Sequence, residues 1–352
     1  MSRDRDRRIA GHIERWFAEH ARELPWRTAP REPYASLVSE LMLQQTQVSR
    51  VIEKFGGFMA RFPTVGDLAD ADEADVLAAW SGLGYYRRAR ALHAAARQVV
   101  ERHEGEVPSD AGSLLALAGV GRYTAGAIAS IVFGERAPIV DGNVARVVLR
   151  IDGVESSSDD PAAMKHLWKR AQGLVDACDD PALLNEGLME LGAVVCTPKS
   201  PGCGACPVRR SCAAKRLDAV DRIPVPKART NQKEHHIAMA IVRDARGRVL
   251  VERRPDDGLW AGLWHGPSLE SDAKAPGKRA IERHVGLVKL RKAEEFRHVT
   301  THRIVRIVPW IGEAEAGFSP VRGEFRAPDE VEGLALSSAH RRLLLSGGES
   351  RD

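Results

Sequence analysis

The sequence lacks any long run of apolar residues. No stretch approaches the roughly 20 consecutive apolar residues that a membrane-spanning helix requires. Residues 1–8, MSRDRDRR, are charged and are followed by mixed residues, whereas a secretory signal would place an apolar segment there. We therefore expect a protein that stays in the cytoplasm and has no membrane partner.

The sequence also has little excess charge and no evident internal repeat or low-complexity tract. Its 52 Lys and Arg residues nearly balance its 48 Asp and Glu residues, and the net charge of +4 is only weak evidence for a polyanionic partner. Hydrophobic residues make up 43% and charged residues 28% of the chain, a balance that argues against disorder. At 352 residues the chain is long enough for two domains.

Cysteines are few, and most of them are crowded together. Four of the five lie between residues 196 and 212, and Cys178 stands apart. Because a cytoplasmic chain seldom forms disulfides, this crowding indicates a metal site made by Cys196, Cys203, Cys206 and Cys212. Six, two and five residues separate successive cysteines. A zinc site is the alternative, but zinc sites tend to use paired short spacings, so the long first gap favours an iron-sulfur cluster.

Apolar spacing divides the chain into a helical part and a mixed part. Up to about residue 195 the pattern predicts helices and no convincing strand, with clear helical spacing in Ala35–Phe55, Tyr85–His103 and Arg122–Phe133. The polar, proline-containing stretch that follows is typical of a linker. Beyond it the pattern predicts strands at Ile237–Val242, Arg248–Arg253 and His302–Ile311, and helices at Ala275–Val285 and Ser338–Leu345.

We therefore predict a multidomain protein. Residues 1–215 form an all-α domain that includes the cysteine loop at 196–212, and residues 216–234 form the linker. Residues 235–352 form an α+β domain.

A glycine-containing turn precedes one of the predicted helices. Gly119 and Gly121 lie just before the apolar helix that begins at Arg122. Glycines at a helix start let backbone N–H groups approach a phosphate, and the helix dipole favours the anion. The segment resembles the helix-hairpin-helix motif of DNA-binding repair proteins. By itself, the glycine pattern is equally typical of a tight turn.

Two carboxylates lie in unusual surroundings. Glu40 is flanked by Leu37, Leu41 and Met42 in the segment 39–47, which suggests partial burial. Asp141 follows Gly121 by twenty residues and stands at the predicted start of another helix. A plain N-cap would explain Asp141 equally well.

The ordered set of these motifs resembles the adenine DNA glycosylases of the MutY type, relatives of endonuclease III in the helix-hairpin-helix base excision repair family. The resemblance covers roughly residues 9–345 and is carried by residues 24–27 (LPWR), 39–47 (SELMLQQTQ), 82–86 (GLGYY), the hairpin, residues 140–143 (VDGN) and the four cysteines. It implies a monomer that removes adenine mispaired with 8-oxoguanine or guanine from double-stranded DNA. It also implies a [4Fe-4S] cluster, a Nudix-like second domain and, in a bacterium, association with the nucleoid.

The resemblance also assigns roles to individual residues. Trp26 and Arg27 would shape the adenine pocket, Asn143 would belong to the catalytic set, and Gly119 and Gly121 would contact the DNA backbone. The residues that would insert into or lie beside the opened base stack are Gln45, Leu83 and Tyr85, and Thr46 would contact the DNA. Such insertion would offset the cost, roughly a few kcal/mol, of rotating the target nucleotide out of the stack.

The reaction requires the carboxyl groups of Glu40 and Asp141 to differ in protonation state. Cleavage of an N-glycosidic bond leaves an anionic base and builds positive charge on the sugar. Glu40 would protonate adenine N7, so burial must raise its pKa from the ordinary value of about 4.3. Asp141 would remain ionised beside the sugar and stabilise the oxocarbenium ion, directly or through a transient covalent adduct.

The residue at position 123 distinguishes a glycosylase with lyase activity from a monofunctional one. In an endonuclease III-like glycosylase with lyase activity, the matching position is a lysine that attacks the sugar as an amine, and tyrosine cannot form that imine. We therefore expect a monofunctional enzyme with Tyr123 in its catalytic set. Ala118 replaces the usual proline of the hairpin, a change expected to loosen the loop. A non-catalytic iron-sulfur DNA-binding protein is a further alternative, disfavoured because both carboxylates are present.

The second domain departs from the family at the segment that would contact the oxidised guanine. Where the family usually has Phe-Ser-His, this chain has Thr300, Thr301 and His302. Thr301 and His302 keep hydrogen-bonding groups, but Thr300 lacks the aromatic surface, so we expect weaker discrimination. The helix that would bind magnesium in a Nudix hydrolase contains a single glutamate, Glu282, so nucleotide hydrolysis is not expected.

Overall fold

The computed structural model describes residues 3–226, 232–286, 288–300 and 302–346. These residues divide into two compact units, one made of 3–70 and 91–226 and the other of 71–90 and 232–346. Residues 71–90, which the sequence analysis assigned to the helical domain, thus pack with the second unit. Within the described ranges, no helix has the length and apolar character needed to cross a membrane.

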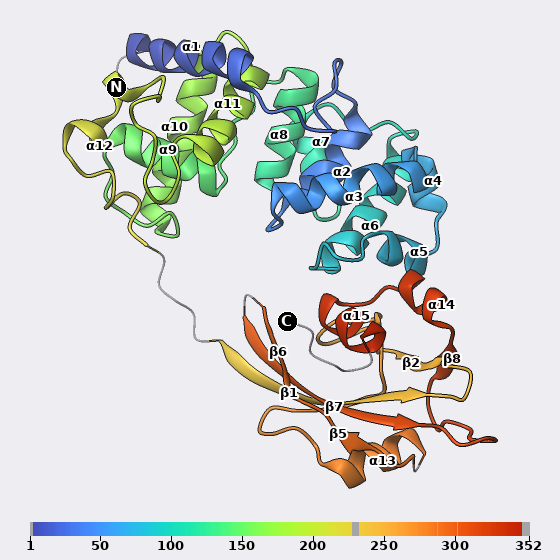
Figure 1. Cartoon of the computed structure of the whole chain (residues 1–352). Helices are drawn as coiled ribbons and strands as arrows, with labels where there is room; N and C mark the ends of the chain where they lie inside the picture. The colour runs from blue at the N-terminus through green and yellow to red at the C-terminus, as the bar shows by residue number, and fades with distance from the viewer. Residues whose placement is uncertain (1–2, 227–231, 287, 301, 347–352) are drawn as a thin grey trace. The chain divides into compact units, whose positions relative to one another are not determined.

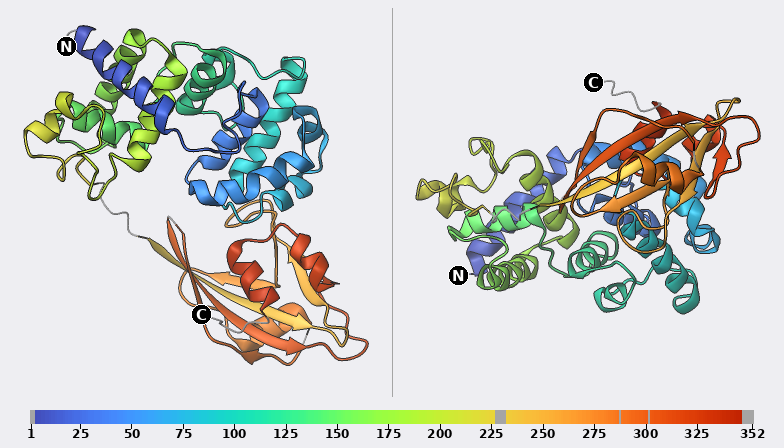
Figure 2. Two further views of the ribbon diagram at one scale, coloured as in Figure 1. Left: turned by 45° about the horizontal axis from the view of Figure 1, so that its top comes forward. Right: turned by 90° about the horizontal axis from the view of Figure 1, so that it is seen from below.

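Helices and loops make up the first unit, without a strand among its described residues (Figures 1 and 2). The helices up to the hairpin are α1 (Arg3–His20), α2 (Pro33–Leu43), α3 (Val48–Arg61), α4 (Val65–Asp70), α6 (Arg87–Arg102), which continues from the other unit, and α7 (Ala111–Leu115). After them come α8 (Arg122–Phe133), α9 (Gly142–Asp152), α10 (Pro161–Ala177), α11 (Pro181–Val194), a short 3₁₀ turn at Arg209–Ser211 and α12 (Ala213–Arg216). The predicted all-α character of this part is confirmed.

Local sequence explains where several of these helices start. Asp160 and Asp180 are the N-caps of α10 and α11, and each carboxylate accepts a bond from a backbone N–H of the first turn. A proline follows each cap, at a position where the missing N–H costs nothing. The chain is thereby set to begin a helix at both places.

Long-range packing holds α1 against α10 and α11, which lie far along the chain (Figure 1). Ile9 and Ile13 are fully buried in the same cluster as Leu184 and Leu188 of α11. Beside them, Arg170 donates two hydrogen bonds, of 2.9 and 2.8 Å, to the carboxylate of Asp6. A planar guanidinium and a carboxylate satisfy each other in this way inside a protein.

The helix expected over Ala35–Phe55 is wrong as a single element. Instead, α2 ends at Leu43 and α3 begins at Val48. Between them Gln45 adopts a left-handed backbone with φ of 56°. The side chain of Gln44 donates to Thr124 Oγ1 of α8 at 3.3 Å and approaches the Gly119 carbonyl at 3.5 Å. No glycine or proline marks this break, so the sequence pattern could not reveal it.

The second unit contains a mixed sheet, which in the described residues has eight strands. These are β1 (Lys233–Arg243), β2 (Val249–Arg253), β3 (Trp264–His265), β4 (Ser268–Ser271), β5 (Arg291–Lys292), β6 (Phe296–Val299), β7 (Arg303–Glu313) and β8 (Glu324–Arg326). The long central strands β1 and β7 run parallel, with Ile237 opposite Ile307, and the other pairs are antiparallel. The predicted strands correspond to β1, β2 and β7, whereas the short strands lacked a detectable period.

Alternation along β1 builds a core on each face of this sheet. Ile237 and Met239 point to one face, where α14 (Pro328–Gly333) and α15 (Ser338–Leu345) pack. Ala238 and Ala240 point to the other face and meet α13 (Lys278–Val285) (Figure 1). The predicted α+β character of this part is confirmed.

A segment from early in the chain completes this second unit. It contains α5 (Glu73–Ala79) and the loop that carries Tyr85. The hydroxyl of Tyr86 donates to the Leu336 carbonyl at 2.6 Å, and Arg90 donates to the Ala261 carbonyl at 2.9 Å. These bonds hold the loop against the sheet-containing part of the chain.

Candidate active site

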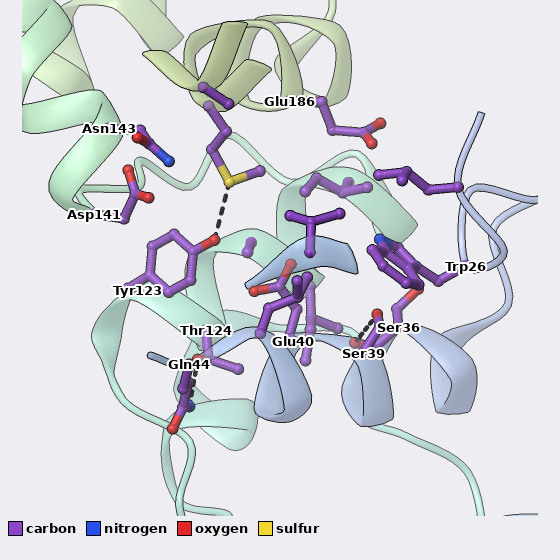
Figure 3. A pocket seen from close by; sticks show the side chains of 18 of the residues that line it. Trp26, Ser36, Ser39, Glu40, Gln44, Tyr123, Thr124, Asp141, Asn143 and Glu186 are labelled. Carbon is purple, nitrogen blue, oxygen red and sulfur yellow. Dashed lines mark hydrogen bonds between the residues drawn. The ribbon is translucent and has the colours of Figure 1, made fainter. Parts of the chain in front are cut away.

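A cavity of about 680 Å³ in the first unit brings the predicted catalytic residues together (Figure 3). Its walls come from α2, α8 and α11, from the turn after α2, and from the loops that precede α2, α8 and α9. Ten residues singled out from the sequence line it: Trp26, Arg27, Glu40, Gln45, Thr46, Gly119, Gly121, Tyr123, Asp141 and Asn143. Segments up to about 170 residues apart in the chain thus converge on one site.

Glu40 projects from α2 with its carboxyl group shielded from water. Leu37 and Leu41 beside it are fully buried, and its Oε2 atom is buried without a hydrogen-bond partner among the described residues. This burial raises the pKa of Glu40 to about 7; the hydroxyl of Tyr123 lowers it and the charge of Asp141 raises it further. The carboxyl group is therefore poised to hold a transferable proton near neutral pH, as the sequence analysis required.

Asp141 is the N-cap of α9, so its position follows from local sequence. Its Oδ1 accepts a hydrogen bond of 2.7 Å from the Val144 N–H. Burial raises the pKa of this carboxyl group, while the backbone N–H groups of Val144 and Asn143 oppose the rise because they favour the charged form. The ionised state of Asp141 during the reaction remains a prediction.

Tyr123 lies in the first turn of α8 and points into the cavity (Figure 3). Its hydroxyl donates to the sulfur of Met189 on α11 at 2.9 Å. Burial raises the pKa of the phenol well above its ordinary value, so the hydroxyl keeps its proton at neutral pH. No lysine is found among the described residues that line this cavity.

Asn143, in the first turn of α9, is held by a neighbouring guanidinium. Arg146 donates at 2.8 Å to the side-chain oxygen of Asn143 and at 2.8 Å to the Gly192 carbonyl. A Cβ atom on Gly192 would lie 2.6 Å from the Cβ of Asn143. Only glycine therefore allows α11 to approach Asn143 this closely.

Two buried glutamates that were not predicted from the sequence form one end of the cavity. Glu186 accepts from Arg27 at 2.9 Å and from Arg31 at 2.7 Å, and Glu190 accepts from Arg27 at 3.0 Å. Both glutamates belong to α11 and are at most 5% exposed. A sequence signal did exist, because they are four residues apart in a largely apolar helix and so share one face.

The hairpin before α8 follows the glycine pattern. Gly119 has φ of 75°, and a Cβ there would lie 2.6 Å from the Cβ of Ala91, so glycine is required. A Cβ on Gly121, the N-cap of α8, would meet open space instead. Ala118 keeps an N–H that proline would lack, and this N–H donates to Gln98 Oε1 at 2.7 Å. The expected loosening of the loop stays a prediction.

The other predicted DNA-contacting residues line a second cavity, of about 850 Å³, in the second unit. Leu83, Tyr85, Thr300 and His302 belong to its walls, whereas Thr301 lies outside the described residues. Tyr85 is 44% exposed and has a left-handed backbone with φ of 48°. The hydroxyl of Thr300 is engaged in its own turn, where it donates to the Arg303 carbonyl at 3.0 Å.

Two aromatic side chains of this second cavity were also missed. The rings of Trp260 and His298 lie with their centroids 5.8 Å apart, and both residues line the cavity. Burial lowers the pKa of His298, so its ring is neutral at pH 7 and offers one donor and one acceptor. An aromatic surface is therefore present although Thr300 does not supply one.

The cysteines of the loop 196–212 are all free thiols. Burial raises the pKa of Cys206 to about 12, and the charges of Cys196, Cys212 and Cys203 raise it further. Thiolates gathered in this way would require a compensating cation. Among the residues that the structure describes, no group of three or more His, Cys, Asp or Glu side chains is arranged to hold a metal ion.

Comparison with protein families identifies both halves of the chain. Residues 38–172 match the family described as HhH-GPD superfamily base excision DNA repair protein. Residues 238–346 match the family described as NUDIX domain. The two matches fall in the α-helical and the sheet-containing parts, respectively.

Individual relatives resemble most of the chain. Mouse adenine DNA glycosylase is 34% identical over 389 aligned residues, which cover 93% of this chain and 75% of the mouse protein. The human protein of the same name is 37% identical, but the alignment covers 74% of this chain and 57% of the human protein. The chain thus spans little more than half the length of some curated relatives that it matches.

A solved structure supports the fold of the helical part. A thermostable thymine-DNA glycosylase superposes with a TM-score of 0.55 and 28% identity, covering 61% of this chain and 98% of that protein. The match shows that the arrangement of helices in this part of the chain also occurs in a DNA glycosylase.

Proposed function

Because the chain belongs to the adenine DNA glycosylase family, we propose that it excises adenine from double-stranded DNA in base excision repair. The base opposite the adenine would be 8-oxoguanine or guanine. The observation that carries the proposal is the pair of carboxyl groups in the first cavity, where Glu40 keeps a substantial protonated fraction at neutral pH and Asp141 is bonded to a backbone donor. This pair supplies the acid and the fixed negative charge that cleavage of an N-glycosidic bond requires.

The flipped adenine would enter the cavity beside Trp26. The Trp26 ring is braced by Phe55, with ring centroids 5.5 Å apart, and offers an apolar wall for a purine. Arg27 and Glu186, already paired to each other, present donors and an acceptor at the same end. A purine carries both kinds of partner on its edge, so this end of the cavity suits recognition of the base.

The chemical step would use the two carboxyl groups in different ways. Glu40 would transfer its proton to N7 as the bond to the sugar lengthens, which makes adenine a neutral leaving group. Asp141 would face the positive charge that develops on the sugar, and the backbone N–H groups on its carboxylate favour the anion. Water, or the Asp141 carboxylate followed by water, would complete the substitution at the sugar.

The absence of an amine nucleophile supports hydrolysis without strand cleavage. Tyr123 occupies the place where a lyase would carry its lysine, and its raised pKa leaves a neutral hydroxyl. A phenol forms no imine with the opened sugar. Asn143, fixed by Arg146, would offer its amide to the substrate or to a water molecule in the same cavity.

A [4Fe-4S] cluster would be held by Cys196, Cys203, Cys206 and Cys212. The four free thiols fit this group because, once deprotonated, they would form a soft sulfur donor set whose negative charge a cationic cluster would compensate. When bound, the cluster would supply four iron–thiolate bonds that tie the loop together. The neighbouring Arg150 donates to the Cys196 sulfur at 3.3 Å, a contact suited to a charged ligand.

The second cavity would hold the base opposite the adenine. Tyr85, partly exposed on a strained turn, is suited to stack against bases. His298 and His302 supply imidazole groups, and Trp260 supplies aromatic surface in the same cavity. An imidazole nitrogen that accepts a hydrogen bond would favour 8-oxoguanine, which carries N7–H, over guanine, whose N7 has no hydrogen.

A single-turnover assay tests the proposal. Duplexes with adenine opposite 8-oxoguanine, guanine or thymine would be incubated with excess protein and treated with alkali to reveal abasic sites. We expect excision from the first two duplexes and not from the third.

Glu40→Gln tests the role of the acid. It should bind the duplex but excise adenine at least a hundredfold more slowly, which corresponds to about 2.7 kcal/mol of activation free energy. Glu19→Gln, an exposed change on α1, is the matched control. A Glu40→Gln rate within tenfold of the parent would refute the assignment.

A further inference from the structure

A thioether lies at an unusual place in the first cavity. Met189 of α11 is one of the residues that line it, and its sulfur accepts the hydrogen bond from Tyr123 (Figure 3, dashed line to the yellow sulfur atom). A thioether is a weak acceptor, whereas the carboxyl group of Glu40 is close enough for the Tyr123 hydroxyl to influence it electrostatically. The Tyr123 hydroxyl has one proton to donate, and the Met189 sulfur and the Glu40 carboxyl group are two acceptors for it.

We propose that Met189 is a positioning residue for the acid, because its sulfur provides the acceptor that the Tyr123 hydroxyl uses while Glu40 is protonated. This inference rests on the proposed function of Glu40 as the general acid. Tyr123 is partly buried, so a protein acceptor for its hydroxyl is favourable. The Met189 sulfur satisfies it without calling on the Glu40 carboxylate.

The consequence follows from competition between the two acceptors. When Glu40 is ionised, its carboxylate is the stronger acceptor, and a bond from Tyr123 would favour this charged form. When Glu40 is protonated, its carboxyl group competes poorly and the hydroxyl turns to the sulfur. Removing the sulfur would therefore disfavour the protonated state alone, since only that state would leave the hydroxyl without its acceptor.

Other charged groups around Glu40 would not change with this substitution. They are Asp141 at the start of α9, Glu186 on α11 and Arg27 in the loop before α2. The charges of Asp141 and Glu186 raise the pKa of Glu40, and that of Arg27 lowers it. A change at Met189 carries no charge of its own, so any effect on Glu40 must pass through Tyr123 or through packing.

The pH dependence of single-turnover excision separates these two routes. The rate should fall at high pH as Glu40 loses its proton. In Met189→Leu, which keeps the size but has no acceptor, we expect this fall to occur about half to one pH unit lower. Met189→Gln, whose amide oxygen is an acceptor, should move it back toward the parent position. Met164→Leu on α10 is the matched control, because Met164 packs against the same core but does not line the cavity.

The same substitution in a Tyr123→Phe protein distinguishes an effect through the hydroxyl from an effect of packing. In Tyr123→Phe there is no hydroxyl to redirect, so adding Met189→Leu should leave the pH profile of the residual activity unchanged. If Met189→Leu lowers the rate equally at every pH, the role of Met189 is structural and the inference is overturned. Met189→Ile replaces the leucine variant if that one unfolds. A parent protein that excises no adenine would overturn the proposed function, and this inference with it, whereas an active parent with an unshifted profile in the variant overturns this inference alone.

Discussion

Asn143 and Cys196 are bound by the same side chain. The guanidinium of Arg146 donates to the amide oxygen of Asn143 at 2.8 Å and to the backbone carbonyl of Cys196 at 2.7 Å. The first residue lines the candidate active site and the second begins the cysteine loop. Because one planar group serves both, a displacement of the loop would be felt at Asn143.

Arg146→Lys tests this connection. A lysine keeps the charge but cannot reach both acceptors with the geometry of a guanidinium. We expect single-turnover excision to fall at least tenfold while the affinity for a mispaired duplex changes less than threefold. Arg136→Lys is the matched control, since Arg136 also donates to backbone carbonyls, those of Val175 and Cys178, but does not line the cavity. Equal effects of both substitutions would show that the Arg146 contacts matter only for folding.

The cysteine loop gives a prediction about metal content. Purified protein should contain about four irons and be yellow-brown, as is typical of such a cluster. Serine at Cys196, Cys203, Cys206 or Cys212 should lower the iron content and the solubility. Cys178→Ser should leave the iron unchanged, because Cys178 is buried beside Val175, apart from the loop. Stoichiometric zinc without iron after anaerobic purification would contradict the cluster assignment.

Glu40 should make the protein less stable as the pH rises. Burial raises the pKa of Glu40 from its ordinary value to about 7 in the folded protein. The folded state therefore binds more protons than the unfolded state between these pH values, and its stability falls as the pH rises through this window. Glu40→Gln removes the effect, so its gain in the midpoint of thermal unfolding should be larger at pH 8 than at pH 5. An equal gain at both pH values would mean that Glu40 titrates normally.

Tyr123→Lys should introduce a new reaction. We expect the parent to leave an intact abasic strand until alkali or heat is applied, and the lysine variant to cleave some strands through an imine with the opened sugar. Borohydride trapping of each protein on the DNA is the measurement. Trapping of the parent at the level of a true lyase would contradict the monofunctional assignment. An inactive lysine variant would not, because the amine can keep too high a pKa.

The second cavity should control the choice between the two mispairs. His302→Ala together with Thr301→Ala, or deletion of residues 227–352, should slow recognition opposite 8-oxoguanine and largely preserve excision opposite guanine. His298→Ala should act in the same direction, since His298 lines the same cavity. The measurement is the ratio of the two dissociation constants at one salt concentration, because phosphate contacts affect both constants alike. A ratio unchanged in all three proteins would exclude the second domain from lesion recognition.

Local sequence was sufficient for features that depend on neighbouring residues. The helix at Arg122–Phe133 has the predicted bounds, and Asp141 caps the next one, because apolar spacing and capping act within a few residues. The resemblance gathered from short motifs also identified ten of the residues that line the first cavity. In each case the interacting residues are close together in the sequence.

The tertiary structure alone decided the features that depend on distant segments. The break at Gln45 is accompanied by contacts of Gln44 with α8, and Glu186 reaches the cavity because α11 packs across it. The pairing of Tyr86 with Leu336 and the parallel pairing of β1 with β7 join residues with no local relationship. The proton affinity of Glu40 likewise depends on burial by groups from other helices. Burial and electrostatic interaction act through space, so their effects appear only once the chain has folded.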